Sequence, residues 1–454
     1  MSIYNIAPWL KTSLRLSIGW LLLILLVGCQ EDMAVSKKYE VVGYYPAWNI
    51  YDRDYEVHDI AASGTAEKLT VINYAFGNVR PIDGRSAESG IVCQLGDPWA
   101  DYQRPYLDAS RTVEQEILET PRPLLGNFQQ LKALKETQPH LKVLISLGGW
   151  TWSKWFSDAA LTEDSRALLI ESCIDLFIRG NLPPSNEAGQ GGDSAALGVF
   201  DGIDIDWEYP AASGHPLNTY RPEDRENFTL LLAEFREALD RVQTELDVDT
   251  PFMLTVATAA GPKKYEQLEL DKIHDSLDFI NVMTYDFHGG WDNTTNFHSN
   301  LFTVEADPTE PTPFSVDSTI QGYLVAGVPS EKLVMGLPFY GRGWTAVSPQ
   351  NNGLFQAAEQ SAPASLEPGF EDYKRLVESG LPRFWQEDAK MPFLFDGETF
   401  WGFDDPESIC HKMAYIHEHQ LGGAMFWELS GDTSDGVLAE AIDQGLNNPA
   451  PCDP

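Results

Sequence analysis

The chain is poor in positive charge. Its 454 residues include 31 Lys and Arg against 68 Asp and Glu, which gives a formal net charge of −37. Nucleic-acid binding depends on clustered Lys and Arg that neutralise phosphates, so the deficit argues against nucleic acid as a partner. Aromatic residues are plentiful: they make up 11% of the chain, with 13 Trp, within a hydrophobic content of 43%. Such a chain can bury a large core, which rules out wholesale disorder.

Short motifs for metal and serine chemistry are also missing. The sequence has no CxxC pair, no HExxH and no GxSxG. It therefore predicts neither a metal site nor a cofactor, and it does not support a serine hydrolase of the α/β-hydrolase type. The 9 His form no recognisable triad, and we expect a structural or solvated role for His215, His288 and His298.

The apolar run near the N-terminus is too short to cross a membrane. Residues 1–28 contain no acid and two bases, Lys11 and Arg15, before an apolar run at Ile18–Val27. That run does not span the ~30 Å hydrocarbon core of a bilayer as a helix, but it suits the apolar region of a secretory signal peptide. We therefore expect residues 1–28 to be a signal peptide.

The signal region ends in Leu26-Val27-Gly28-Cys29, which resembles the bacterial lipoprotein box. In that box the Cys is lipidated and becomes the first residue of the mature protein. The alternative is an ordinary secretory signal with a chance Cys. The resemblance implies lipidation of Cys29, a short tether at residues 29–38 and a lipid anchor at the bacterial cell envelope. Gln30 is unlike the Asp of inner-membrane retention, which favours the outer membrane in a Gram-negative host.

Cysteine is scarce: the chain has 5, of which four follow Cys29. Export permits disulfides. However, Cys173 lies on the apolar face of a predicted helix and Cys410 in a similar helix, where a buried free thiol is the commoner outcome. The pairing of Cys93, Cys173, Cys410 and Cys452 cannot be deduced from the sequence.

Eight short segments rich in β-branched residues recur along the chain. They are Val41–Tyr45, Val71–Phe76, Val143–Leu147, Gly202–Asp206, Leu254–Ala257, Phe279–Met283, Leu333–Leu337 and Ala424–Phe426. Amphipathic helical stretches separate several of them, as at Asn127–Glu136 and Arg225–Leu239, and such alternation indicates a parallel α/β protein. Eight units favour a closed (β/α)8 TIM barrel over an open sheet.

The interval between the seventh and eighth strands is too long for one crossover. Residues 342–405 are aromatic and loop-rich, and we expect them to form a small α+β insertion. The barrel would then comprise residues 39–341 and 406–446.

Chemistry in such barrels occurs at the C-terminal face, where the strands end. Polar and aromatic residues follow most of the predicted strands, which predicts a single site built from several strand ends. These residues are Tyr44–Trp48, Asn73–Phe76, Ser146–Trp150, Asp204–Glu208, Met283–Asp286, Tyr340–Arg342 and Trp427–Glu428.

The most informative segment is FDGIDIDWEYP at residues 200–210. Strand side chains alternate between faces, so Asp204, Asp206 and Glu208 point one way and the intervening apolar residues the other. Three carboxylates inside a barrel would repel one another if all were ionised. We therefore expect shared protons and at least one raised pKa, as a general acid requires. The alternative, an exposed acidic edge strand, conflicts with the apolar residues on the other face. Asp201, at the strand start, has an expected structural role.

FDGIDIDWEYP resembles the DxxDxDxE signature of family 18 glycoside hydrolases, the chitinases. Six further segments resemble the family in the same order and cover nearly all of residues 41–440: VVGYYPAW, LTVINYAFGNV, LKVLISLGGWTWS, FINVMTYDFHGGWD, KLVMGLPFYGRGW and LGGAMFWELSGD. The resemblance implies a TIM barrel with an insertion domain, a bacterial chitinase activity on chitin or chitooligosaccharides, and no cofactor.

The resemblance also implies a mechanism. Glu208 would protonate the glycosidic oxygen, and the 2-acetamido carbonyl of the substrate would attack the anomeric carbon to give an oxazolinium ion. Asp206 would hydrogen-bond the acetamido N–H and stabilise the intermediate. Asp204 would share a proton with Asp206, and Tyr285 would hydrogen-bond the acetamido group.

Further residues are expected to bind the substrate. Trp427 resembles the stacking floor beneath the −1 sugar, and Asp286 is expected to hydrogen-bond sugar hydroxyls. The other expected subsite residues are Met283, Tyr340, Arg342, Tyr44 and Phe76, together with Trp150 and Trp291 as product-side stacking residues.

Two other functions stay open at this stage. The first is a chitin-binding lectin, because this fold loses activity when the acid is replaced; here Glu208, Asp206 and Tyr285 are all present. The second is a related glycosidase that acts on peptidoglycan or N-glycan cores, against which the insertion argues because it would wall a deep cleft. We expect a monomer.

Overall fold

The computed structural model describes residues 39–119, 121–185, 189–309 and 313–452. The expected signal peptide, the tether and Cys29 lie outside these ranges. Within them, none of the helices combines the length and the apolar character that a membrane crossing requires.

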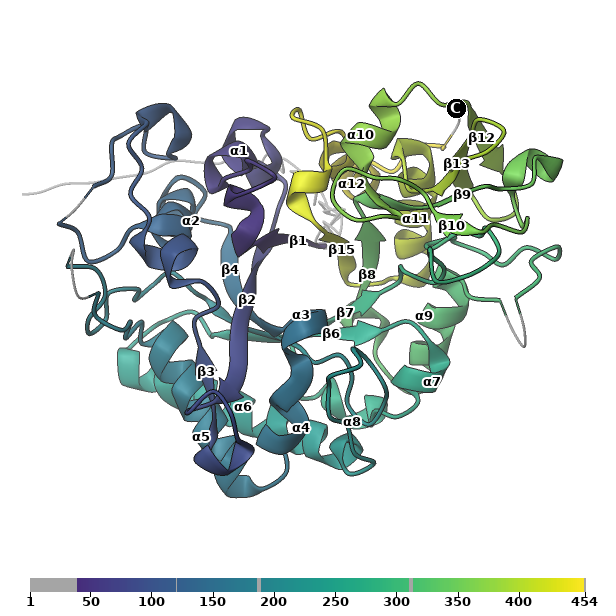
Figure 1. Cartoon of the computed structure of the whole chain (residues 1–454). Coiled ribbons are helices and arrows are strands. Elements are labelled where there is room, and N and C mark those ends of the chain that lie inside the picture. The colour runs from purple at the N-terminus through teal and green to yellow at the C-terminus, as the bar shows by residue number, and fades with distance from the viewer. Residues whose placement is uncertain (1–38, 120, 186–188, 310–312, 453–454) are drawn as a thin grey trace, which may run out of the picture. The chain divides into compact units, whose positions relative to one another are not determined.

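Eight parallel strands close into a barrel (Figure 1). The strand β1 pairs with both β2 and β15, which completes the ring. The closed (β/α)8 barrel predicted from the sequence is therefore confirmed. In chain order the barrel strands are β1 (Glu40–Pro46), β2 (Val71–Pro81), β4 (Lys142–Gly148), β5 (Gly202–Asp206), β6 (Met253–Ala259), β7 (Phe279–Met283), β8 (Leu333–Pro338) and β15 (Gly423–Trp427).

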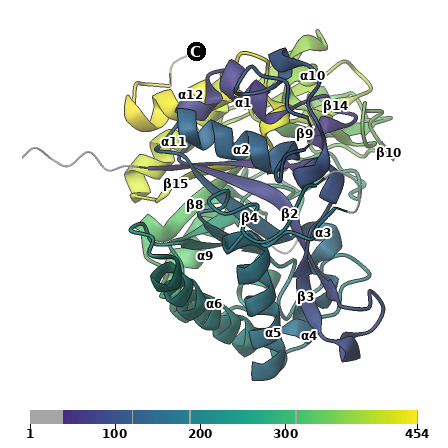
Figure 2. The same cartoon turned by 90° about the vertical axis from the view of Figure 1, so that its left-hand side faces the viewer.

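Helices follow the strands and cover the outside of the barrel; Figure 2 shows α5 and α6 outside the strands. The main ones are α1 (Val57–Ala62), α2 (Gly126–Thr137), α5 (Glu163–Cys173), α6 (Asp224–Leu246), α9 (Val316–Val325), α11 (Pro406–His419) and α12 (Val437–Asn447), with short helices α3 (Gly149–Trp152), α4 (Phe156–Ala159), α7 (Pro262–Tyr265) and α8 (Leu270–Ile273) between them.

The sequence of β5 explains how strand and helix layers meet. Ile203 and Ile205 are fully buried on the outer face, and Trp207 stacks on Phe156 with ring centroids 5.4 Å apart. The edge of Trp207 also meets Phe228 of α6 at 5.7 Å. Burial of each such side chain contributes roughly 1.5–3 kcal/mol. This outer packing fixes the strand and turns its alternate residues, the acids, toward the barrel interior.

A second, antiparallel sheet lies in the chain between β8 and α11. Its strands are β9 (Tyr340–Thr345), β10 (Gln360–Ser361), β11 (Phe370–Asp372), β12 (Arg383–Gln386), β13 (Met391–Phe395) and β14 (Phe400–Gly402), with the helix α10 (Tyr373–Glu378) after β11. The sheet has an apolar cluster of its own, which includes Trp344, Phe393 and Phe400. Phe297 and Val304 of the β7–α9 loop belong to the same cluster, so the sheet and this barrel loop share one small core.

Both cysteine pairs are disulfides, so the expectation of free thiols at Cys173 and Cys410 is wrong. Cys173 of α5 is joined to Cys93, with Cα atoms 5.0 Å apart. Cys93 lies on β3 (Ile91–Gln94), an antiparallel strand that extends the main sheet beside β2 and packs against α5. The sequence analysis recognised the apolar face of α5 but not β3, and it therefore missed the partner.

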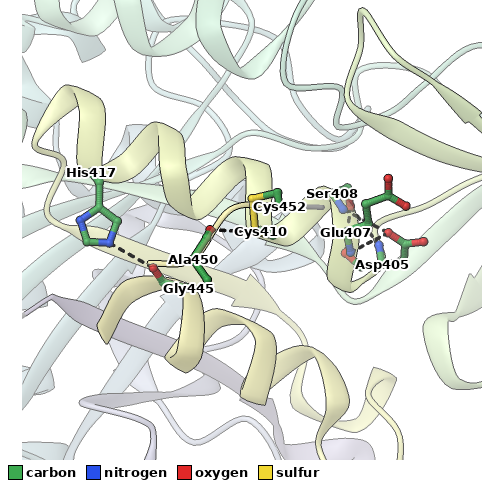
Figure 3. Close-up of a disulfide and its surroundings, with 8 residues drawn as sticks. All are labelled: Asp405, Glu407, Ser408, Cys410, His417, Gly445, Ala450 and Cys452. Carbon is green, nitrogen blue, oxygen red and sulfur yellow. Dashed lines mark hydrogen bonds between the residues drawn. A yellow bond between two sulfur atoms is a disulfide. The ribbon is translucent and has the colours of Figure 1, made fainter. Parts of the chain in front are cut away.

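The second disulfide joins Cys410 of α11 to Cys452, with Cα atoms 5.6 Å apart. Figure 3 shows the segment after α12 returning to α11 at this bond. Nearby, the His417 ring lies 3.0 Å from the carbonyl oxygen of Gly445 in α12. The bond therefore ties the last described residues to a barrel helix.

Candidate active site

Asp204, Asp206 and Glu208, called the β5 ladder below, lie in and directly after β5 at the C-terminal mouth of the barrel. All three are buried, with 0%, 4% and 8% of the residue exposed. The inward orientation predicted by strand alternation is consistent with this burial. Each carboxyl nevertheless has different partners, and these differences decide its chemistry.

Asp204, the deepest acid of the β5 ladder, accepts hydrogen bonds from several strands. The hydroxyls of Tyr44 (2.8 Å), Ser146 (2.7 Å) and Thr255 (2.6 Å) donate to it, and the amide of Asn281 lies 3.4 Å away. Burial raises the pKa of Asp204, while these donors favour its ionised form. The donors belong to β1, β4, β6 and β7, so the barrel encircles this carboxyl with hydroxyl and amide groups.

Asp206 lacks such support, and at Glu208 only part of the effect of burial is opposed, by Tyr209 and Lys264. The Oδ1 atom of Asp206 is buried and has no hydrogen-bond partner among the described residues. Burial, followed by the charges of Glu208 and Asp204, raises the pKa of Asp206 well above its ordinary value. Burial likewise raises the pKa of Glu208 to about 7. These two groups titrate together, and their shared affinity for a proton is what a general acid requires.

The main chain around Glu208 is held in place by the neighbouring loops. Its N–H donates to the hydroxyl of Ser153 at 2.9 Å, and its carbonyl accepts from the Asn218 amide at 2.9 Å. The Ser153 hydroxyl in turn donates to Gly149 at 2.8 Å. The position of the acid is therefore set by Ser153, which directly follows α3, and by Asn218 as well as by its own strand.

Asp286, directly after β7, has strong cationic support. Arg342 of β9 binds both carboxylate oxygens at 2.8 Å, and the Tyr340 hydroxyl donates at 2.9 Å. The Asp286 side chain is 36% exposed, and Arg342 and the nearby His298 outweigh its partial desolvation and hold the pKa of Asp286 below its ordinary value. Sequence analysis expected Arg342 to contact the sugar; in the structure its guanidinium is committed to Asp286.

His298 lies behind this ion pair. It is fully buried, and its Nδ1 is 3.7 Å from Asp286 Oδ1. Burial lowers the pKa of His298, which favours the neutral ring. The ring is therefore buried and not solvated, and it borders the candidate site.

An aromatic surface faces the β5 ladder from β15, β1 and β2. Trp427 stacks on Phe76 with centroids 5.8 Å apart, and Tyr44 lies 5.5 Å from the Trp427 ring. Met283 and Tyr285 pack against the same cluster. Burial and the surrounding acids raise the pKa of Tyr285 well above its ordinary value, so its hydroxyl stays a donor.

The two expected product-side tryptophans lie apart from this surface. Trp150 is 46% exposed and meets His215 edge-on at 5.7 Å. Trp291 is 59% exposed, and the Arg342 guanidinium lies 5.1 Å from the centroid of its ring. No stacking contact between the two is present among the described residues.

The sequence analysis missed several residues at the site. Thr255 sits in register with Asp204 on the next strand, and Asn281 has the same inward position on β7, so strand parity could have found both. Trp48, with its ring 6.1 Å from Phe76 and 6.4 Å from Trp427, belongs to a strand end that the analysis did mark. Lys264 of α7, whose ammonium lies over the ring of Tyr209, belongs to a segment without a recognisable motif.

Among the described residues, no group of three or more His, Cys, Asp or Glu is arranged to hold a metal ion. The site therefore offers a protonated carboxyl, a second carboxyl with a free oxygen, a tyrosine hydroxyl and a flat aromatic surface. These groups together can protonate a leaving oxygen and hold a polar, flat-faced substrate.

A parallel barrel with interacting carboxyls at the end of one strand is an architecture of glycoside hydrolases. The chain belongs to glycosyl hydrolases family 18, whose family model matches residues 40–432. This match confirms the family resemblance found in the motifs.

Characterised relatives carry chitinase names. Chitinase A1 of Niallia circulans is 39% identical over 432 residues, which covers 87% of this chain and 57% of the relative. Chitinase 63 of Streptomyces plicatus is 35% identical over 411 residues, with 89% and 60% covered. This chain thus spans less than two thirds of the length of these relatives.

Solved structures show the same fold. The catalytic domain of psychrophilic chitinase B from Arthrobacter TAD20 is 38% identical and has a TM-score of 0.85, with 92% of this chain and 97% of that chain covered. A family 18 N-acetylglucosaminidase from Paenibacillus barengoltzii is 32% identical with a TM-score of 0.68, and 90% and 100% are covered.

Proposed function

We propose that the protein is a chitinase that hydrolyses β-1,4 linkages between N-acetylglucosamine units of chitin and chitooligosaccharides. The observation that carries this proposal is the pairing of Glu208, whose pKa is raised to about 7, with Asp206, which keeps a buried oxygen without a partner among the described residues. Family membership and the chitinase names of the relatives support it.

The proposed mechanism is substrate-assisted and retains the anomeric configuration. Glu208 donates its proton to the glycosidic oxygen while the C1–O bond breaks. The carbonyl oxygen of the substrate acetamide bonds to C1 and forms an oxazolinium ion. Asp206 accepts the acetamido N–H and stabilises the positive charge, and Tyr285 donates to the acetamido oxygen. Water, deprotonated by Glu208, then opens the ring.

Asp204, which lies deeper in the barrel than Asp206, supports this step. It is proposed to share a proton with Asp206, so that Asp206 can be neutral before the reaction and charged when the oxazolinium ion forms. The three hydroxyl donors to Asp204 stabilise its own charge. The second carboxylate of an ordinary retaining enzyme is thereby replaced by a positioning group.

The aromatic surface is proposed as the sugar-binding floor. Trp427 would stack on the −1 sugar, with Tyr44, Phe76 and Met283 at the sides. Flat rings bind the C–H faces of sugars by burying apolar area. On the opposite side, Asp286 would accept from sugar hydroxyls while Tyr340 and Arg342 hold it. The exposed rings of Trp150 and Trp291 would bind the product-side sugars.

Product analysis on chitin hexasaccharide with anomeric detection tests the proposal. New reducing ends should appear first as the β-anomer, and cellohexaose, which carries hydroxyl in place of acetamide, should be left intact. Release of the α-anomer or comparable cleavage of cellohexaose would contradict the mechanism. Release of single sugars alone would indicate an N-acetylglucosaminidase, and binding without cleavage would indicate a lectin.

We further propose that the protein is an exported, lipid-anchored monomer at the bacterial cell envelope. The lipoprotein-box sequence before Cys29 supports the anchor. Metabolic labelling with a palmitate analogue should mark the protein, and Cys29→Ser should abolish the mark and release or mislocalise the enzyme. Labelling that persists in the variant would contradict the proposal.

A further inference from the structure

Lys264 of the short helix α7 lies beside Tyr209, the residue that follows Glu208. Its ammonium lies 3.8 Å from the centroid of the Tyr209 ring, and Tyr209 directly follows Glu208 in the chain. Lys264, Tyr209 and Trp207 line one small cavity next to β5 and β6. A cation held over the face of an aromatic ring is attracted by the negative face of that ring. The Tyr209 ring therefore fixes the Lys264 ammonium beside the main chain that carries Glu208.

This ammonium has no carboxylate partner of its own. Among the described residues, no Asp or Glu oxygen lies within the 4.0 Å ion-pair distance of Lys264. Burial lowers the pKa of Lys264, and the charges of Glu208 and Asp286 oppose that shift and favour the ammonium form. Asp286 is already bound on both oxygens by Arg342. Glu208 is thus the neighbouring acid whose charge is left for Lys264 to balance.

The charges around Glu208 come from four elements. Asp204 and Asp206 of β5 and Asp286 after β7 are acidic, and Arg342 of β9 is occupied by Asp286. Tyr209 and Lys264 oppose the acids. Burial raises the pKa of Glu208, whereas Tyr209 and Lys264 lower it. Without Lys264, Glu208 would have to become an anion in an acidic site where, among the described residues, no Lys, Arg or His lies within the 4.0 Å ion-pair distance of it.

We propose that Lys264 is a positioning residue for the acid step, whose ammonium stabilises the Glu208 carboxylate left behind when its proton moves to the glycosidic oxygen. This inference rests on the proposed function. In the step, the proton leaves Glu208, the C1–O electron pair goes to the leaving oxygen, and the acetamide oxygen bonds to C1. One negative charge then appears on Glu208. The opposite charge on Lys264 favours that state over the protonated one.

Loss of the Lys264 charge should shift the pH dependence of activity in one direction. Loss of the Lys264 charge removes an influence that lowers the pKa of Glu208, so the pKa of Glu208 rises further. Glu208 then stays protonated to a higher pH. In its protonated form it is a weaker acid and gives its proton to the glycosidic oxygen less readily. The basic limb of the kcat/KM profile should move upward by about one pH unit, while the plateau on chitotetraose falls several-fold.

The test compares Lys264→Met with Lys263→Met, which removes a neighbouring exposed charge. Lys263→Met should keep the basic limb and the plateau of the wild-type kcat/KM profile. Lys264→Arg, which keeps the positive charge, should restore most of both features. A 4-nitrophenyl chitobioside has a good leaving group and needs little protonation, so Lys264→Met should slow it much less than chitotetraose. Circular dichroism checks folding, and Lys264→Gln serves as a second variant if Lys264→Met misfolds.

The possible results separate the inference from the proposed function. If the wild type cleaves chitotetraose with retention but Lys264→Met lowers activity without moving the limb, or slows both substrates equally, Lys264 has only a structural or binding role and the inference is wrong. If the wild type does not cleave chitooligosaccharides, the proposed function fails and the inference with it.

Discussion

The acids after β5 and the acid after β7 lie at the same mouth of the barrel but have opposite electrostatic surroundings. No Lys, Arg or His lies within the 4.0 Å ion-pair distance of the β5 ladder among the described residues, and burial raises the pKa of each of its acids. Asp286 instead has Arg342 on both oxygens, and its pKa is lowered. Similar side chains thus favour a bound proton at one strand end and a fixed anion at the other.

The second sheet supplies the groups that lower the pKa of Asp286. Arg342 and Tyr340, which hold Asp286, both come from β9, the first strand of that sheet. In the β5 ladder, Asp204 instead faces hydroxyls and one amide from the barrel strands. The added sheet therefore supplies positive charge to one side of the site and leaves the other side free to carry a proton. Separation of the two roles requires both regions.

The largest effect should come from Glu208→Gln. Because Glu208 is the acid at the end of the β5 ladder, its loss should lower hydrolysis of chitotetraose by about 10³-fold or more, while oligosaccharide binding remains. Steady-state kinetics and binding calorimetry measure the two properties separately. More than a few per cent of the wild-type rate in the variant would contradict the assignment.

Asp206→Asn should have the next largest effect. The variant keeps the shape but loses the charge that stabilises the intermediate, so kcat should fall by about 10²-fold. A thiazoline analogue, which copies the oxazolinium ion, should lose affinity in parallel, because the same contact serves both. A fall in rate with unchanged affinity for the analogue would show that Asp206 does not contact the acetamido group.

Arg342→Met removes the positive charge that holds Asp286 as an anion, and so makes the two strand ends more alike. Without the guanidinium, the main group that lowers the pKa of Asp286 is lost, so its pKa should rise toward the ordinary value. Activity should fall about tenfold, and its loss on acidification should begin at a higher pH because Asp286 is protonated earlier. Arg342→Lys, which keeps the charge but not both hydrogen bonds, should lie between. An unchanged acid limb would contradict the proposed role of Asp286 as an anion.

Tyr44→Phe should have the smallest effect. The variant keeps the ring beside Trp427 and removes one of three hydroxyl donors to Asp204. The pKa of Asp204 should rise, and kcat should fall a few-fold, since the lost hydroxyl acts on Asp204 and two hydroxyl donors remain. Ser146→Ala, which removes another of these donors, should behave similarly.

Much of the barrel and of its acids could be predicted from local pattern. The β-branched segments located all eight barrel strands, and the alternation of acid and apolar residues at residues 203–208 predicted which side chains face inward. These features depend on neighbouring residues in one strand. The same alternation along β6 and β7 also predicts that Thr255 and Asn281 point inward, although neither residue was among the expected site residues.

Features that join distant segments could not be predicted in the same way. The partners Asp286 and Arg342 are 56 residues apart, and only the path of the second sheet brings them together. The bond between Cys93 and Cys173 depends on β3, a four-residue strand with a weak pattern. Lys264 lies in a charged turn that resembles any solvated loop, and its place over Tyr209 follows from the closure of the barrel.

The pH dependence of kcat/KM on chitotetraose tests the central contrast most directly. Since burial raises the pKa of Glu208 to about 7, the free enzyme should be active while Glu208 holds its proton. Activity should therefore form a plateau below pH 7 and fall tenfold per pH unit above it, with the plateau kept well into the acid range because Asp286 stays ionised. Activity that is constant up to pH 9, or that rises as a group with a pKa near 7 loses its proton, would contradict the assignment of Glu208 as the protonated acid.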